Sequence, residues 1–442
     1  MEQFLEKNIN LKHFIKYVAP SVLMFLFISL YSIIDGFFVG KYVGTNALAS
    51  INIVVPLTGV LSGIAVMISA GSCAFTMIKL GEKDYGDANK NFSLICILAL
   101  PLGAVFFITS FLWLKNLLEI MGASKILFDN SYTYSLIFLA FYPCALLSII
   151  FEYYIRIDGK PFVTLILYIT GVMTNVISDY ILVAECNLGV LGAALGTGFS
   201  FTASSLIGLF YFMFFSNRLK FVKTKWDFKF LFQSCFNGVS EMISECSASI
   251  VTLIANIIIM KIAGEDGVAA FSIVSYIHFL FTAVNFGYIA GVSPIISYCY
   301  GAKQFNSINK CYMYSKKFIC ITSIGIFILS QIAAPEFIMI FADDKTVVYD
   351  LATYGLRVTS ISFLFSGLNI FASGMFTAYG NGKVSALISI NNDLIAIIIA
   401  MFICSWIWGL KGVWIAMPLA ELSTFILSII IIRRYSKLYN YL

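Results

Sequence analysis

The chain has 442 residues, of which 60% are hydrophobic and 16% aromatic, while only 12% are charged. Soluble domains carry about 25% charged residues. This chain has about half that share, which is too few to give a soluble protein of this length a polar surface. The composition excludes a soluble enzyme, a nucleic-acid-binding protein and a disordered scaffold. The net charge of +5 does not change this, because the basic residues form short clusters between apolar segments.

Twelve apolar segments follow one another along the chain, each long enough to cross a bilayer as a helix of about 20 residues. They leave no room for a sizeable soluble domain, and the sequence therefore predicts an all-α polytopic membrane protein. The predicted spans are 14–36, 47–72, 92–114, 132–155, 161–184, 189–215, 233–261, 267–298, 313–334, 352–378, 384–408 and 412–432.

The distribution of Lys and Arg predicts the orientation of these spans. Of the 28 basic residues, 21 lie before the first span, after the even-numbered spans or at the C-terminus, and six lie after odd-numbered spans. Cytoplasmic loops are enriched in Lys and Arg. We therefore expect both termini to be cytoplasmic, and the strict alternation supports an even number of spans.

A shift of 220 residues aligns the chain with itself. Gly71 then falls on Gly291, and Gly192 falls on Gly412. This repeat predicts two pseudo-symmetric six-helix bundles, residues 1–215 and 231–442, joined by a basic cytoplasmic linker at 216–230. Because each half has an even number of spans, the halves are parallel repeats, which transporters use to alternate access to a site between them.

Four polar residues inside the first-half spans align with apolar residues of the second half: Asp35, Asn175, Asp179 and Thr197. At a rise of about 1.5 Å per residue, all four lie at a similar depth in the outer leaflet. Ionisable groups inside a membrane are costly and mark functional sites, and two neighbouring carboxylates should share a proton or a cation. The alternative is a buried polar network that only fixes the packing of the helices.

The second half has its own buried polar residues. Glu241 and Glu245 lie one turn apart in the seventh span and either relay cations or attract substrate, or form a solvated wall facing the cytoplasm. Asp393 either lines a cavity or faces water near the inner mouth. His278 is either a proton carrier or a packed hydrogen-bonding group. Glu421 lies in the middle of the last span, with no partner evident from the sequence.

Five short segments, in order along the chain, resemble motifs of the bacterial MATE (multidrug and toxic compound extrusion) antiporters. They are DGFFVG at 35–40, RIDGKP at 156–161, NVISD at 175–179, GAALGT at 192–197 and SPIISY at 293–298. The resemblance implies secondary-active efflux of organic, often cationic and aromatic, drugs and toxic compounds across the plasma (inner) membrane. The driving force would be H⁺ or Na⁺ flowing inward.

The resemblance also assigns roles to individual residues. It implies a cation-coupling site at Asp35, Asn175, Asp179 and Thr197, where Na⁺ would be held by the first three, and a bend of the first span at Pro20. The sequence has no Walker A motif, no G-x-S-x-G motif and no metal-ligand spacing, so we expect no enzymatic activity and no cofactor beyond the coupling ion. The expected partners are small organic substrates and the lipid bilayer. We expect a functional monomer that does not bind nucleic acid.

An alternative is a flippase or exporter of a lipid-linked saccharide or another amphipathic metabolite. Such a cavity needs several basic residues to meet a pyrophosphate, whereas the charged residues inside the predicted spans are almost all acidic. A scaffold or receptor that transports nothing gives no reason for the asymmetric pair Asp35 and Asp179. The sequence therefore favours the antiporter.

Overall fold

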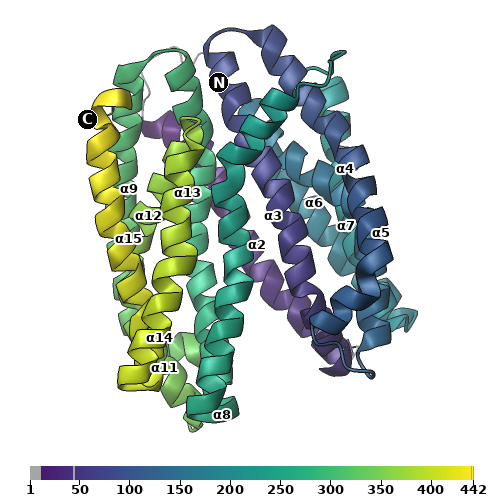
Figure 1. Ribbon diagram of the computed structural model, residues 1–442, viewed down its shortest axis with the longest axis vertical. Coiled ribbons are helices and arrows are strands. Elements are labelled where there is room, and N and C mark those ends of the chain that lie inside the picture. The colour runs from purple at the N-terminus through teal and green to yellow at the C-terminus, as the bar shows by residue number, and fades with distance from the viewer. Residues whose placement is uncertain (1–10, 43–44, 440, 442) are drawn as a thin grey trace. The chain divides into compact units, whose positions relative to one another are not determined.

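The computed structural model describes the backbone of residues 11–42, 45–439 and 441, together with their side chains outside 31–46 and 48. Over these residues all regular structure is helical, as Figure 1 shows. A helix satisfies the backbone N–H and C=O groups within one segment, which lipid requires because it offers no water to bond them. The predicted all-α fold class is confirmed.

Eleven helical segments in the described part of the chain are long and apolar enough to cross a membrane. The longest is α8 (Phe228–Gly301), which is interrupted at Gly264, where φ is 65° and ψ is −155°, and therefore forms two spans. The twelve predicted spans are thus present. The other helices are α2 (Leu11–Tyr42), α3 (Thr45–Gly81), α4 (Tyr85–Ile120), α5 (Phe128–Ile157), α6 (Pro161–Asp179), η1 (Tyr180–Glu185), α7 (Gly189–Phe214), α9 (Phe305–Ile332), α10 (Ala334–Met339), α11 (Val347–Thr359), η2 (Ser360–Ser362), α12 (Phe363–Ala378), α13 (Gly382–Ile390), η3 (Asn391–Ile395), α14 (Ala396–Trp408) and α15 (Leu410–Tyr439).

By their internal contacts the residues divide into two compact units. Unit 1 comprises Met1–Ser29 and Val239–Leu442, and unit 2 comprises Leu30–Gly238. The division into 1–215, 216–230 and 231–442 follows the sequence repeat instead and stays a prediction. Pro20 lies inside α2, which continues as a helix on both sides of it.

Unit 2 is built around α5, which packs against α3, α4, α6 and α7. The buried Tyr142 of α5 donates its hydroxyl hydrogen to the backbone oxygen of Leu61 over 2.7 Å, so a polar group in the core is satisfied. Asp158, just after α5, accepts from the Tyr211 hydroxyl at 2.6 Å and from the Leu219 N–H at 3.2 Å. Burial raises the pKa of Asp158, and these hydrogen bonds oppose the rise. They also hold the start of the linker that follows α7.

In unit 1, Trp414 of α15 belongs to an apolar core to which α8, α10, α11, α12, α14 and α15 contribute. It is 1% exposed and stacks on Phe271 with ring centroids 5.9 Å apart. Gly355 of α11 leaves room for the indole, because a Cβ at this position would lie 2.9 Å from the ring. Figure 1 shows α9, α12, α13 and α15 of the same unit running side by side.

The turn that follows α3 is repeated after α8. Lys83 and Lys303 both adopt a positive φ, 63° and 55°, which is uncommon for residues other than glycine. Each donates its N–H to the carbonyl three residues back over 3.1 Å, and the next residue donates to the carbonyl five residues back. These two turns are 220 residues apart, so the backbone supports the duplication read from the sequence.

Glycines allow the closest approaches between helices within each unit. In unit 2, a Cβ on Gly71 would collide with the backbone oxygen of Ser234, and a Cβ on Gly238 would collide with that of Met67. In unit 1, Gly287 lies against the backbone of Val22 in the same way. Helices in lipid associate through such small residues, since no hydrophobic force drives them together.

Gly264 gives a test of the helix break in α8. Its φ and ψ fall in a region open essentially only to glycine, and a Cβ there meets no atom within 4 Å. Gly264→Ala should therefore destabilise the protein by about 2 kcal/mol through backbone strain alone. The measurement is the unfolding midpoint of the purified protein in mixed micelles.

Gly325→Ala is the matched control, because Gly325 also has open space around it but lies inside the helix α9. Alanine is favoured over glycine in a helix by about 1 kcal/mol, so this variant should be as stable as the parent or more stable. Equal effects of the two substitutions would contradict the strained turn.

Candidate functional site

Two of the first-half residues predicted from the sequence lie together in unit 2. Asn175 and Asp179 are one turn apart at the end of α6, with exposed fractions of 1% and 3%. The backbone of α7 approaches this face closely, since a Cβ on Gly196 would collide with the Asp179 carboxylate. Asp179 is therefore fixed between two helices, with an amide beside it.

The other two first-half residues differ from this pair. Thr197 is half-buried, and its hydroxyl donates to the Ala193 oxygen of its own helix over 3.1 Å, while its neighbour Gly196 faces Asp179. Asp35 is part of α2, but its side chain is outside the described residues. Its pairing with Asp179 stays a prediction.

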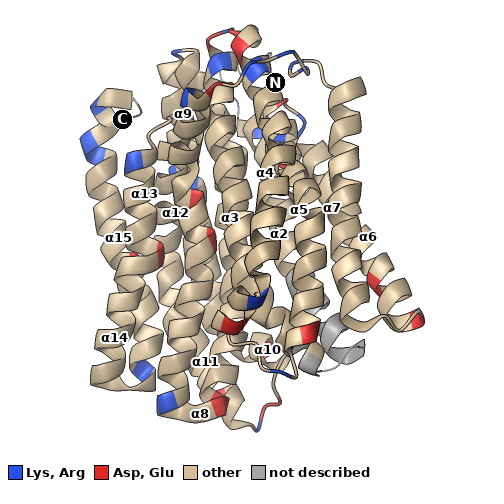
Figure 2. Ribbon diagram, turned by 45° about the vertical axis from the view of Figure 1, so that its right-hand side comes forward, with Lys and Arg blue, Asp and Glu red and all other residues tan. Residues whose placement is uncertain are grey.

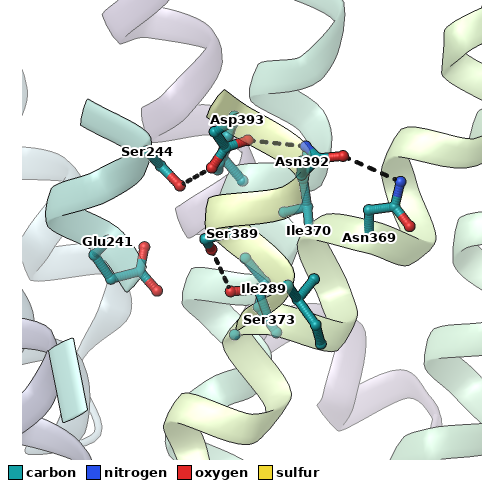
Figure 3. A pocket seen from close by; sticks show the side chains of 12 residues that line it. Glu241, Ser244, Ile289, Asn369, Ile370, Ser373, Ser389, Asn392 and Asp393 are labelled. Carbon is teal, nitrogen blue, oxygen red and sulfur yellow. Dashed lines mark hydrogen bonds between the residues drawn. The ribbon is translucent and has the colours of Figure 1, made fainter. Parts of the chain in front are cut away.

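A second polar cluster lies in unit 1, and Figure 3 shows the part of it that contains Ser244, Asn369, Asn392 and Asp393. Asp393 accepts hydrogen bonds from the Ser244 hydroxyl over 2.5 Å and from the Asn392 amide over 2.8 Å. The Asn369 amide donates to the Asn392 oxygen over 3.3 Å and to the Glu421 carboxylate over 2.6 Å. Residues from α8, α12, η3 and α15 thus join in one network.

Asn369 is the centre of this network, although no prediction from the sequence included it. It is 1% exposed, and besides its bonds to Asn392 and Glu421 it accepts from the Ser428 hydroxyl over 3.1 Å. It supplies the partner for Glu421 that the sequence did not reveal. A lone amide among the apolar residues of α12 was the available signal.

A small pocket opens beside this network. Glu241 projects into it from α8, and Asp393 lines it from η3, together with Ser373 and Ser389, whose hydroxyls lie 2.8 Å apart (Figure 3). Glu241 and Asp393 both present carboxyl groups to this pocket, and two ionised carboxylates repel each other. A proton or a bound cation relieves this repulsion, so the pocket favours positively charged ligands.

Glu245 and His278, which the sequence also singled out, do not line this pocket. Glu245 is exposed, one turn beyond Glu241. The Nε2 atom of His278 lies 3.1 Å from the hydroxyl oxygen of Ser362, within hydrogen-bonding distance. The imidazole ring stacks on the ring of Phe363, with the two centroids 4.8 Å apart. These contacts are those of a packed, hydrogen-bonded side chain.

Both carboxylate sites coincide with π-helical turns. Asp179 directly precedes η1, and Asp393 lies within η3. Such turns are rare and occur frequently at functional sites, because the extra residue redirects side chains out of the helical register. Within the described residues, no group of three or more His, Cys, Asp or Glu side chains is placed to hold a metal ion.

Known proteins resemble this chain over nearly its whole length. The family MatE matches residues 20–181 and 242–404, two segments offset by close to the 220-residue shift of the repeat. The Multidrug export protein MepA of Staphylococcus aureus (strain N315) is 26% identical over 425 residues, covering 95% of this chain and 92% of the relative. The protein of the same name from Staphylococcus haemolyticus (strain JCSC1435) is 26% identical over 428 residues, with the same coverage.

Solved structures share the fold. A MATE protein in complex with MaL6 has a TM-score of 0.93 at 20% identity, covering 100% of this chain and 99% of the other. An outward-facing multidrug resistance MATE family transporter of the MOP superfamily has a TM-score of 0.90 at 20% identity, covering 100% and 98%. Since the family match extends over most of the residues, this chain is a multipass membrane protein that belongs to the MatE family of transporters.

Proposed function

We propose that this protein exports organic, often cationic and aromatic, compounds from the cell in exchange for H⁺ or Na⁺. Membership of the MatE family and the name multidrug export protein of its relatives support this proposal. The observation that carries it is the burial of Asp179 beside Asn175 against the backbone of α7, because a carboxylate is placed inside a membrane only at high cost.

In the proposed cycle, Asp35 and Asp179 take up the coupling ion from outside, with Asn175 and Thr197 completing the site. Na⁺ suits this set of oxygen donors, and so does a proton shared by two carboxylates. Ion binding rearranges α2 around Pro20, where the missing backbone N–H permits a bend. Substrate is then released outside, and the return of the transporter carries the ion inward.

The acidic pocket in unit 1 contributes the attraction for positively charged substrates. Glu241 and Asp393 supply the negative charge, and Glu245, exposed one turn along α8 from Glu241, is a candidate for the relay of protons to it. An acidic pocket is unsuited to the pyrophosphate of a lipid-linked saccharide, so antiport is favoured over that alternative. In this proposal the protein works as a monomer in the plasma membrane, with both termini in the cytoplasm.

The coupling site is tested with Asp35→Asn and Asp179→Asn in everted vesicles. In these vesicles efflux is measured as the accumulation of a fluorescent organic cation in the lumen. Each variant should lower ion-driven efflux at least about tenfold, because the neutral amide no longer exchanges a proton or balances the charge of Na⁺. Asp350→Asn, at an exposed position in the first turn of α11, should leave efflux unchanged. Normal efflux in both coupling variants would refute the site.

Replacing Na⁺ by choline at constant pH in the same vesicles identifies the ion. Loss of efflux in choline assigns the coupling to Na⁺, whereas efflux that persists and collapses with the pH gradient assigns it to H⁺.

The role of the second pocket is tested with Glu241→Gln. Removing one charge should weaken the binding of a monovalent cationic substrate about tenfold, which corresponds to about 1.4 kcal/mol, and should leave a neutral substrate of similar size unaffected. Direct binding to the purified protein measures both. An equal loss for the two substrates would show that Glu241 acts through the packing of the pocket and not through its charge.

A further inference from the structure

A groove on unit 1 shares no lining residue with the acidic pocket of the same unit. It has a volume of about 550 Å³ and is formed by α9, α12 and α15, with α12 packed against the other two helices. Most of its lining is apolar, including Ile319, Ile324, Leu364, Leu368, Phe425 and Ile429. The proposed transport function uses none of these residues.

Two basic side chains, Lys316 of α9 and Arg433 of α15, line the same groove. Ile324 follows Lys316 by eight residues, and Phe425 precedes Arg433 by eight residues on the antiparallel helix. At about 1.5 Å per residue, both basic groups therefore lie on the same side of an apolar part about 12 Å long, with Tyr312 one turn beyond Lys316. Figure 2 shows the basic residues of α9 and α15 near the end of the unit where the C-terminus lies.

The positive charge at this end is not neutralised by the protein. Lys316 and Arg433 are both exposed, and neither takes part in an ion pair within the described part of the chain. An unpaired ammonium and a guanidinium beside an apolar channel match an amphipathic anion. The phosphate would bind the two cations, with the guanidinium able to form two parallel hydrogen bonds, and the hydrocarbon would lie along the helices.

We propose that this groove binds an anionic phospholipid, with its phosphate on Lys316 and Arg433 and one acyl chain between α9, α12 and α15. This inference goes beyond the proposed efflux and does not depend on the coupling ion or the substrate. It agrees with the predicted orientation, because the basic end is then in the cytoplasmic leaflet, where basic pockets between helices bind acidic headgroups.

The experiment measures lipid retention by the purified full-length protein in detergent. Phosphatidylglycerol and phosphatidylcholine with the same acyl chains are titrated separately, and bound lipid is counted by native mass spectrometry. The parent protein should retain phosphatidylglycerol at concentrations where phosphatidylcholine is lost. The double variant Lys316→Gln/Arg433→Gln should weaken phosphatidylglycerol binding on the order of tenfold or more.

The control is Lys317→Gln/Arg434→Gln, which removes the same charge from the next residue of each helix. Lys317 and Arg434 are exposed but do not line the groove, so this variant should bind phosphatidylglycerol like the parent. Equal losses in the two double variants, or equal retention of the two lipids by the parent, would overturn the proposal.

A third variant tests the acyl chain. Ile324→Trp fills the apolar part of the groove from an exposed position, so it should reduce phosphatidylglycerol binding while both cations remain. If inorganic phosphate alone displaces the lipid completely, or if Ile324→Trp has no effect, the groove holds a free anion and the lipid assignment is wrong. Efflux is not measured in these experiments, so a failure of the transport proposal leaves their outcome unchanged.

Discussion

Close contact between helices through glycine is the constraint on which the rest of this structure depends. Lipid tails are as apolar as the side chains of the helices, so no hydrophobic gain drives the helices together. Their association depends instead on close packing, which small residues allow because the backbones can approach each other. Gly71 and Gly238 achieve this in unit 2, and Gly287 does so in unit 1. The same kind of contact fixes the candidate coupling residue, because the absence of a side chain at Gly196 leaves the volume that the Asp179 carboxylate occupies.

The buried polar groups depend on this packing for their partners. Asn369 can bond Asn392, Glu421 and Ser428 at once only because η3 and α15 both lie within reach of α12. A half-satisfied network in an apolar environment would cost more than an apolar core. The π-helical turns at Asp179 and Asp393 place carboxylates in such settings, while the surrounding helices keep their own backbone bonds.

Much of the fold could be predicted because the membrane imposes it. The length of each apolar segment gave the twelve spans, including the two that meet at Gly264, since about 20 residues cross the bilayer. The repeat could also be predicted, because glycines recur at a spacing of 220 residues in the two halves of the sequence. The network around Asn369 could not, because it joins residues more than fifty positions apart, and neither pattern nor spacing specifies which helices become neighbours. The π-helical turns and the short α10 also left no signal in the hydropathy.

The single glycine between α14 and α15 has a mechanical consequence. Gly409 has a φ of 59° and joins the two helices directly, and a Cβ on Gly412 would collide with the Cys404 oxygen across the joint. There is no length of chain here to absorb a relative displacement. A displacement of α14 is therefore passed on to α15, and η3, which carries Asp393, leads into α14 without a loop.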